Sequence, residues 1–150
     1  MRITNKKILW ACMQGLLYRP YKWGGDDPMG GFDCSGGIQE LLASIGIDPK
    51  GDQTAQALYN HFDLEIDNHW IGDSYASIYR SFGHLLFFGK GNDKITHVSM
   101  AINHRSMFEF AGGGSKTNTI DDAIRHNAYA RIRAIDSRKD FISAIGILGG

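Results

Sequence analysis

The sequence predicts an α+β fold, with helices in the first part of the chain and an antiparallel sheet after them. In the first part, apolar residues recur at spacings of three and four, as on one face of a helix. In the second part, short apolar or alternating runs are separated by turn residues, which is typical of strands. The chain has 150 residues without an internal repeat or linker, so we expect a single domain over residues 1–150.

Three helices are expected before residue 63. The first covers about residues 5–18 and ends before Pro20. The second begins at Cys34 or Ser35 and continues to about Ser44, with Gly46 as a plausible C-terminal cap. The third is short and covers residues 53–62. Between the first two, residues 21–31 hold four glycines and one proline, which predicts a long turn and no regular element.

Strands dominate the rest of the chain. Residues 63–81 are ambiguous and rich in loop signals. Strands are expected at 85–88, 96–102 and 107–111, with a hairpin turn over 103–106. A short helix capped by Asp121 or Asp122 is expected to reach Asn127, and strands follow at 130–135 and 141–148. N-terminal helices packed on an antiparallel sheet are the expected architecture.

Charge and hydropathy exclude two classes of partner. Lysine and arginine number 16, as do aspartate and glutamate, so no global basic field attracts nucleic acid. No apolar stretch approaches the roughly 20 residues of a membrane helix, so no membrane insertion is expected. Lys6 and Lys7 precede a short apolar run that outlines a lipoprotein signal, but Trp10 stands where a small residue is needed. We recognise no signal peptide; the protein is expected to be made in the cytoplasm.

Cys34 is the strongest candidate for a catalytic side chain. A thiol attacks as the thiolate, which a helix N-terminus or a histidine favours. Cys34 lies at an expected helix start, after a glycine-rich turn that lets a substrate approach closely. The alternative is a buried structural cysteine, which is the role expected of Cys12. Two cysteines are too few for a disulfide framework, and the sequence leaves open whether Cys12 and Cys34 form a single disulfide.

His97 and Glu109 are the candidates for the other catalytic roles. Of six histidines, His97 alone begins an expected strand, where a base would be held rigidly. Glu109 is the one charged residue of the next strand, between two phenylalanines, and a carboxylate there would hold the imidazole in its working tautomer. The alternative for Glu109 is a solvent-facing position.

Several segments together resemble the NlpC family of cell-wall cysteine peptidases, which have compact papain-like α+β domains. The similarity covers nearly the whole chain in the right order. Its segments are Tyr-Lys-Trp-Gly-Gly at 21–25, Gly-Phe-Asp-Cys-Ser-Gly at 31–36, Leu-Leu-Phe-Phe at 85–88, Thr-His-Val-Ser at 96–99 and Phe-Glu-Phe-Ala-Gly-Gly at 108–113. The Asp-Cys-Ser-Gly core is specific in combination with the His-Val strand.

The resemblance implies a role for each matching residue. Cys34 would be the nucleophile and His97 the general base, and Glu109 would complete the triad. Tyr21 would line the cleft near the thiolate, and Asp33 and Ser35 would contact the amino end of a peptidoglycan stem peptide. Glu109 departs from the family pattern, which usually has His, Asn or Gln. His84 departs from a usual Asp, with no catalytic consequence expected.

The implied activity is cleavage of stem peptides at the γ-D-glutamyl-diamino acid bond through an acyl-enzyme, without metal or other cofactor. The motif forms are most similar to those of phage and prophage members of the family. The protein would therefore reach the cell wall after release from the cell or as part of a virion. Expected partners are cell-wall peptidoglycan peptides, with phage tail or other virion proteins as further candidates.

Other functions remain open on the sequence. The same triad would serve an N-acetylmuramoyl-L-alanine amidase or an acyltransferase. A non-catalytic phage tail or wall-binding component would keep the fold, although Cys34 and His97 are intact. The run Gly-Gly-Gly-Ser-Lys-Thr at 112–117 looks like a phosphate-binding loop but lacks the Gly before Lys. Acidic pairs at 26–27 and 121–122 fit turns and caps better than calcium ligands.

Overall fold

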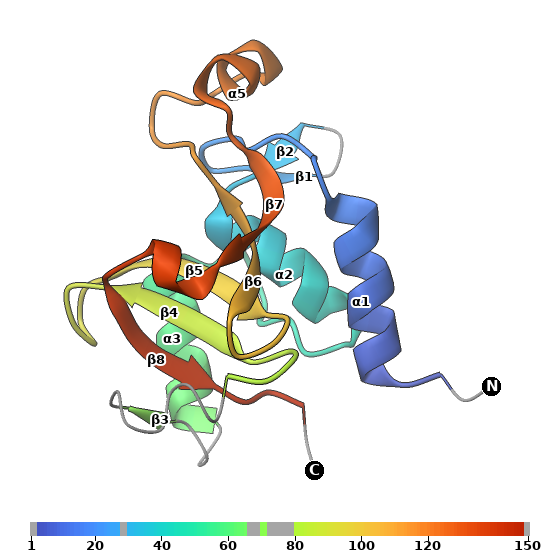
Figure 1. Cartoon of the computed structure of the whole chain (residues 1–150), viewed down its shortest axis with the longest axis vertical. Helices are drawn as coiled ribbons and strands as arrows, with labels where there is room; N and C mark the ends of the chain where they lie inside the picture. Colours follow the sequence, from blue (N-terminus) through green and yellow to red (C-terminus); the bar gives the residue numbers. More distant parts are fainter. Residues whose placement is uncertain (1–2, 28–29, 66–69, 72–79, 149–150) are drawn as a thin grey trace. The chain divides into compact units, whose positions relative to one another are not determined.

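The computed structural model describes residues 3–27, 30–65, 70–71 and 80–148 (Figure 1). The helices described are α1 (Asn5–Leu16), α2 (Cys34–Ser44), α3 (Ala55–Glu65) and α5 (Ile120–His126), with a 3₁₀ turn, η1 (Ile135–Ser137). The strands described are β1 (Asp26–Asp27), β2 (Gly31–Phe32), β3 (Trp70–Ile71), β4 (Leu85–Gly89), β5 (Ile95–Ala101), β6 (Ser106–Ala111), β7 (Tyr129–Ala134) and β8 (Phe141–Ile145).

The chain divides into two compact units, each built from two stretches of sequence. The first unit comprises Met1–Asp52 and Glu109–Arg131, and the second comprises Gln53–Phe108 and Ile132–Gly150. Strands β6 and β7 each continue from one unit into the other. A six-stranded sheet has the order β3-β8-β4-β5-β6-β7, and β1 and β2 form a separate two-stranded sheet. Helices lead and strands follow, which confirms the predicted α+β class.

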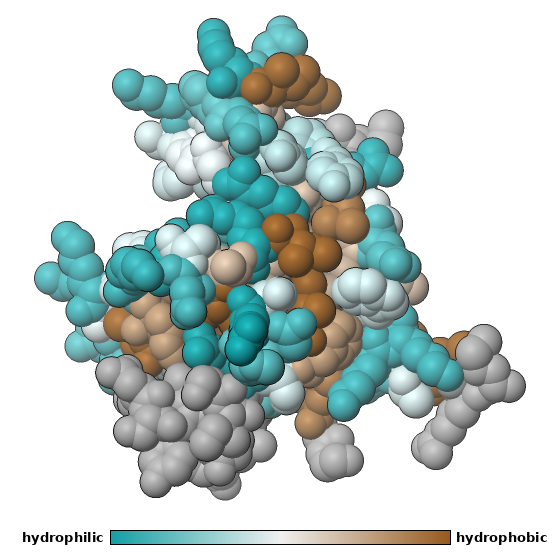
Figure 2. Space-filling model, in the orientation of Figure 1, coloured by the Kyte–Doolittle hydropathy of each residue, from teal (hydrophilic) through white to brown (hydrophobic). Residues whose placement is uncertain are grey.

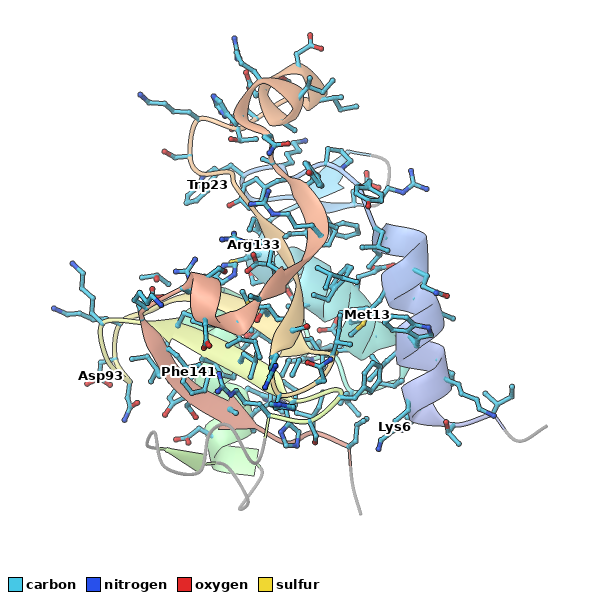
Figure 3. All side chains as sticks on the ribbon, viewed as in Figure 1. Lys6, Met13, Trp23, Asp93, Arg133 and Phe141 are labelled. Atoms are coloured by element: carbon cyan, nitrogen blue, oxygen red, sulfur yellow. The ribbon has the colours of Figure 1, made fainter. Side chains whose placement is uncertain are left out.

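Helices α1 and α2 pack against each other in the first unit (Figure 1). The Thr4 side chain accepts the Lys7 N–H and caps α1. The buried face of α1 carries Leu9, Met13 and Leu16, and Figure 3 shows Met13 between the two helices. These spacings of four and three confirm the predicted helical face.

Glycine ends α2 as predicted. Gly46 has φ +77° and donates its N–H to Ala43, and Ile47 donates to Leu42. This pair of bonds is a Schellman motif, which only a residue in the left-handed region permits without strain. The helix therefore runs from Cys34 to Ser44, and its N-terminal residue is the candidate nucleophile.

Residues 21–31 correct the sequence prediction. They contain β1, and they lead into β2, whose first residue is Gly31; Asp26 pairs with Phe32 and Asp27 with Gly31 in antiparallel register. Strands of two residues are too short to show alternation, so the glycine content outweighed any strand signal. Phe32 is fully buried, and its ring meets Phe110 edge-on at 5.3 Å between centroids.

The cap of α5 also differs from the prediction. Thr119 is the N-cap, and its side chain accepts the Asp122 N–H; the Asp122 side chain accepts the Thr119 N–H in return. This is a capping box, in which the acidic residue stands three positions inside the helix. Asp122 therefore caps indirectly, and Asp121 is not the cap. The helix ends at His126, and its C-cap, Asn127, has φ +53°.

The second unit is built on the central strands of the sheet. Strand β4 pairs antiparallel with β5 and β8, and β5 pairs with β6 at Met100–Phe108 and Ala101–Met107. Helix α3 packs on β5. The buried cluster on this sheet consists of Leu86, Phe88, Ala101, Met107, Ile135 and Ala144. Burial of every residue of β4 explains its continuous apolar run, which lacks alternation.

Most of residues 63–81, which the sequence left ambiguous, lie outside the described residues. Among the helices that the structure describes, none combines the length and the apolar character needed to cross a membrane.

Candidate active site

Cys34 is the first residue of α2, and Asp33 is its N-cap. The Asp33 side chain accepts the Gly36 N–H at 2.7 Å and the Ser35 hydroxyl at 3.2 Å. By position, the N–H groups of Cys34 and Ser35 have no carbonyl inside the helix to bond. These amides carry the positive end of the helix dipole, which favours negative charge beside the thiol. Cys34 is a free cysteine of intermediate exposure, so a substrate can reach it.

The glycine turn packs tightly against the start of α2. A Cβ on Gly36 would lie 2.2 Å from the Gly25 carbonyl oxygen, which also accepts the Asp33 N–H at 3.1 Å. A Cβ on Gly25 would lie 2.5 Å from the Gly31 carbonyl oxygen. No real side chain tolerates such distances, so glycine is required at both positions. The close backbone packing fixes the direction in which the helix presents Cys34.

Burial raises the pKa of Asp33, and the negative charge of Asp52 adds to the effect. Hydrogen bonds from the Gly36 backbone, the Ser35 side chain and the Gly24 backbone oppose it. A hollow of about 330 Å³ lies beside the start of α2 in the first unit. Four of its lining residues are acidic; the lining consists of Asp26, Gly36, Gln39, Glu40, Asp48, Gly51 and Asp52. The charges there favour cationic groups over anionic ones.

Tyr21 lies within electrostatic reach of Cys34. Burial of its ring, with 6% of the residue exposed, raises the pKa of the phenol, and the charges of Cys34 and Asp33 raise it further. The phenol therefore stays protonated at neutral pH and can donate a hydrogen bond. A parallel bridge pairs Tyr21 with Phe32 of β2, two residues before Cys34.

Glu109 is fully buried on β6, which excludes the solvent-facing alternative. The next residue on the strand, Phe110, packs against Gly37 of α2: a Cβ on Gly37 would lie 2.2 Å from Cδ1 of that ring. This contact ties the helix of Cys34 directly to the strand segment of Glu109, inside the first unit. A carboxylate at this depth is retained only where it has a partner.

His97 lies on β5 in the second unit and is 6% exposed. It stands opposite Phe88 of β4, with ring centroids 5.6 Å apart. Arg138 lies over the other ring, with its Cζ 5.1 Å from the Phe88 centroid. The imidazole is therefore largely buried against the Phe88 ring on the sheet.

Asp140 is a neighbour of His97 that sequence reasoning missed. Arg138 donates to its carboxylate at 3.0 and 2.8 Å, and these bonds lower the pKa of Asp140; the charge of His97 lowers it slightly more. Asp140 precedes β8, and its carbonyl accepts the Gly89 N–H at 2.9 Å. Strand pairing between distant segments creates this proximity, so no local pattern in the sequence signals it.

The two units divide the predicted site residues. The first unit contains Tyr21, Asp33, Cys34, Ser35 and Glu109, and the second contains His97. Within the first unit, Cys34, its cap Asp33 and Tyr21 gather around the start of α2. Cys34 starts a helix, as expected. His97 lies on a strand as expected, but it is the third residue of β5 and not the first. The catalytic roles of both residues stay predictions.

A comparison with models of known protein families shows the family of this chain. Residues 18–134 match the model of the NlpC/P60 family. The chain belongs to the NlpC/P60 family. The resemblance drawn from the motifs is therefore confirmed at the level of the family; the phage-type assignment stays a prediction.

Individual relatives support the same placement. The bifunctional muramidase/DL-endopeptidase CwlT of Bacillus subtilis (strain 168) is 31% identical over 109 residues, which cover 73% of this chain and 27% of CwlT. The chain therefore spans about a quarter of that relative's length.

Solved structures show the NlpC/P60 fold. The NlpC/p60 domain of the peptidoglycan hydrolase SagA gives a TM-score of 0.65 at 18% identity, over 96% of this chain and 100% of that domain. RipD of Mycobacterium tuberculosis, a non-catalytic NlpC/p60 domain protein, gives 0.67 at 15% identity, over 98% of this chain and 100% of its own. At these identities the similarity concerns the fold alone, and it includes both a hydrolase and a non-catalytic protein.

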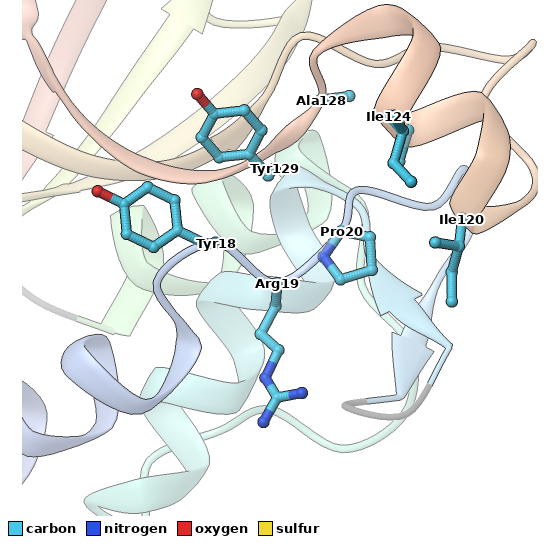
Figure 4. Close-up of a pocket in the computed structure, with 8 residues that line it drawn as sticks. Tyr18, Arg19, Pro20, Ile120, Ile124, Ala128 and Tyr129 are labelled. Carbon is cyan, nitrogen blue, oxygen red and sulfur yellow. The ribbon is translucent and has the colours of Figure 1, made fainter.

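Two further features of this NlpC/P60 domain concern ligands other than the substrate. Among the residues that the structure describes, no group of three or more His, Cys, Asp or Glu side chains is arranged to hold a metal ion. A second hollow of about 310 Å³ is lined by Tyr18, Arg19, Pro20, Ile120, Ala123, Ile124, Ala128 and Tyr129 (Figure 4). Ile120 and Ile124 are 53% and 74% exposed, and Figure 2 shows hydrophobic side chains over α5. This hollow shares no residue with the predicted catalytic set.

Proposed function

We propose that this NlpC/P60 domain is a cysteine endopeptidase that hydrolyses the stem peptides of peptidoglycan. The observation that carries the proposal is the place of Cys34: a free, partly exposed cysteine at the first position of α2, with Asp33 as cap and Tyr21 as a protonated neighbour. A structural cysteine would instead lie on the buried face of a helix, as Leu41 and Leu42 do here.

The proposed chemistry follows from these positions. His97 takes the proton of the Cys34 thiol, and the resulting thiolate attacks the scissile carbonyl carbon; its electron pair forms the C–S bond while the carbonyl oxygen takes the negative charge. In this proposal the amides at the start of α2 and the Tyr21 hydroxyl donate hydrogen bonds to that oxyanion. His97 then protonates the leaving amine, which breaks the C–N bond and leaves a thioester. Water, deprotonated by His97, attacks the thioester carbon; the C–S bond breaks, the sulfur leaves with its electron pair and recovers the proton from His97, and the carboxylate product is released.

Glu109 is proposed as the third member of the triad, orienting His97 and stabilising the imidazolium. Its complete burial supports this role, because a buried carboxylate is costly unless it serves a partner. Asp33 and Ser35 are proposed to contact the amino end of the stem peptide. The acidic lining beside α2 supports a substrate that carries a free ammonium group there.

The bond proposed is that between γ-D-glutamate and the diamino acid. The DL-endopeptidase name of CwlT supports it, as does the family resemblance. An amidase or an acyltransferase on the same residues is the alternative chemistry. For delivery, we propose synthesis in the cytoplasm and action on the wall after release or with a virion.

A second candidate is a non-catalytic wall-binding domain. RipD favours it, since a protein of this fold is non-catalytic and adapted to peptidoglycan binding. The retained Cys34 and His97 favour the enzyme.

Digestion of purified peptidoglycan, with the new chain ends identified by mass spectrometry, separates these functions. The endopeptidase exposes new amino groups on the diamino acid. An amidase would expose the amino group of the first stem residue and leave free muramoyl ends. A binding domain would sediment with the wall and release no fragment, which would overturn the enzyme proposal.

A further inference from the structure

The loop after β6 is closed by hydrogen bonds around Thr117. This residue is 1% exposed, and its hydroxyl lies 2.8 Å from Nδ1 of His126 in α5. Its carbonyl accepts the Trp23 N–H at 2.7 Å. The run of glycines that imitates a phosphate-binding loop is thus anchored to α5 and to the segment of Tyr21. Figure 3 shows Trp23 at this end of the first unit.

Gly113 in this loop lies directly on the ring of Tyr21. A Cβ at position 113 would be 2.1 Å from Cδ1, 2.5 Å from Cε1 and 2.6 Å from Cγ of that ring. Real contacts of this kind are not closer than about 3.4 Å without strain, so the contact exists because residue 113 has no side chain. Gly114, the next residue, would meet nothing within 4 Å.

The backbone of Tyr21 is also fixed. Its N–H donates to the Ala128 carbonyl at 3.1 Å, and the following residue, Lys22, donates to Phe32 at 2.9 Å. With the main chain held, rotation about the Cα–Cβ bond of Tyr21 decides where the phenol oxygen lies, because rotation of the ring about Cβ–Cγ leaves that oxygen on the rotation axis. Gly113 lies against the edge of the ring formed by Cγ, Cδ1 and Cε1, so it limits the swing of the whole ring about Cα–Cβ.

We propose that Gly113 is a positioning residue, which holds the Tyr21 ring so that its hydroxyl faces the Cys34 thiol. The loop of Gly112–Thr117 acts through this contact and touches no reacting atom itself. The catalytic consequence rests on the proposed function, since it requires the Tyr21 hydroxyl to donate to the developing oxyanion. Displacement of an oriented group by about 1 Å costs on the order of a hundredfold in rate, so we expect Gly113→Ala to lower kcat at least about tenfold with little change in KM.

The test compares Gly113→Ala with Gly114→Ala, which adds the same methyl group to open space. Both proteins carry 3-fluorotyrosine, and the ¹⁹F resonance of Tyr21 is identified as the one missing in Tyr21→Phe. The Tyr21 resonance should shift in Gly113→Ala and stay in place in Gly114→Ala. Alkylation of Cys34 with iodoacetamide should shift it in the wild type and in Gly114→Ala, but much less in Gly113→Ala.

Kinetics of stem-peptide hydrolysis supply the second readout. Because Gly113 acts through the tyrosine, Gly113→Ala should add less than about twofold to the loss caused by Tyr21→Phe. Two results would overturn the proposal. One is a Tyr21 resonance that does not move in Gly113→Ala. The other is a double variant whose loss in kcat is the full product of the losses in Gly113→Ala and Tyr21→Phe.

A third variant covers failure of Gly113→Ala to fold. Thr117→Val removes the hydrogen bond to His126 without adding an atom near the ring. It should broaden or shift the Tyr21 resonance; an unchanged resonance overturns the proposal. If the wild type cleaves no wall peptide while the resonances behave as expected, the proposed function fails and the positioning of Tyr21 by Gly113 stands.

Discussion

The Oδ1 atom of Asp33 accepts the Gly36 N–H at 2.7 Å, and this bond makes Cys34 the first residue of α2. The same carboxyl is partly buried, and burial raises its pKa. Asp33 therefore contributes to stability as a hydrogen-bond acceptor while its ionised form is disfavoured by the surroundings.

Asp33→Asn keeps the cap and removes the charge. A carboxyl whose folded pKa is raised gives its stabilisation fully below the unfolded pKa of about 3.9 and loses it as pH rises through the folded value. We therefore expect Asp33→Asn to be at least as stable as the wild type at pH 7, and the wild type to gain relative to it as pH falls toward 3.5. Asp33→Ala should be less stable than Asp33→Asn by about 1 kcal/mol at both pH values, because it also removes the cap.

Chemical denaturation at several pH values measures these differences in the free energy of unfolding. If the free energy of unfolding depended on pH equally in the wild type and in Asp33→Asn, the Asp33 carboxyl would not have a raised pKa in the folded protein. Hydrolysis by Asp33→Asn should nevertheless fall if Asp33 contacts the substrate ammonium group.

Gly37→Ala tests the contact between α2 and the strand of Glu109. Its new methyl group would lie 2.2 Å from the Phe110 ring, so the ring or the helix must move. Overpacking of this kind costs about 1–3 kcal/mol. Gly15→Ala in α1 is the matched control, since its Cβ meets nothing within 4 Å and alanine favours a helix by up to about 1 kcal/mol. Thermal unfolding measures the Tm of both variants, and that of Gly37→Ala should be the lower. Equal Tm values for Gly37→Ala and Gly15→Ala would refute the contact between Gly37 and Phe110.

The two cysteines should differ in reactivity. Burial raises the pKa of Cys12, and the charge of Glu40 raises it further, so little thiolate forms there at neutral pH. Cys34 lies at a helix N-terminus and should react first with iodoacetamide at pH 7. Peptide mapping after brief alkylation locates the label, and the label on Cys12 should appear only as the pH is raised. Preferential labelling of Cys12 at pH 7 would contradict the assignment.

His97 and Glu109 should contribute unequally to the rate. His97→Ala removes the proposed base and should cost at least about a hundredfold in kcat. Combining it with Cys34→Ala should add nothing, because members of one catalytic unit are not additive. Glu109→Ala should cost less than His97→Ala, and Glu109→Gln less still, since the amide of Gln keeps the shape of the side chain and an oxygen that accepts a hydrogen bond. Wild-type activity in folded Glu109→Ala would remove Glu109 from the triad.

Local signals made the start of α2 predictable. Asp33 is a favoured N-cap residue, and the apolar spacing of Ile38, Leu41 and Leu42 sets the helical face behind it. The hairpin between β5 and β6 was equally predictable, because Asn favours turns through hydrogen bonds to its own backbone. In the structure, the Asn103 side chain accepts the N–H groups of Arg105 and Ser106.

Features made by tertiary pairing were not predictable. The β1–β2 pair is too short to carry a period, and the strand partners of Asp26 and Asp27 lie beyond a glycine turn. Asp140 reaches the field of His97 through the pairing of β8 with β4 and of β4 with β5. Gly113 was visible only as part of a glycine run, since the ring that requires it lies far away in the sequence.

The proposed function depends most on Cys34 as the nucleophile of wall-peptide hydrolysis. The direct measurement is the release of soluble fragments from purified peptidoglycan by the wild type, Cys34→Ser and Cys12→Ala, each checked for folding by circular dichroism. We predict that Cys34→Ser releases no fragments above background, while Cys12→Ala matches the wild type within about twofold. Fragment release by Cys34→Ser at the wild-type rate, or its loss in a folded Cys12→Ala, would contradict the assignment of Cys34.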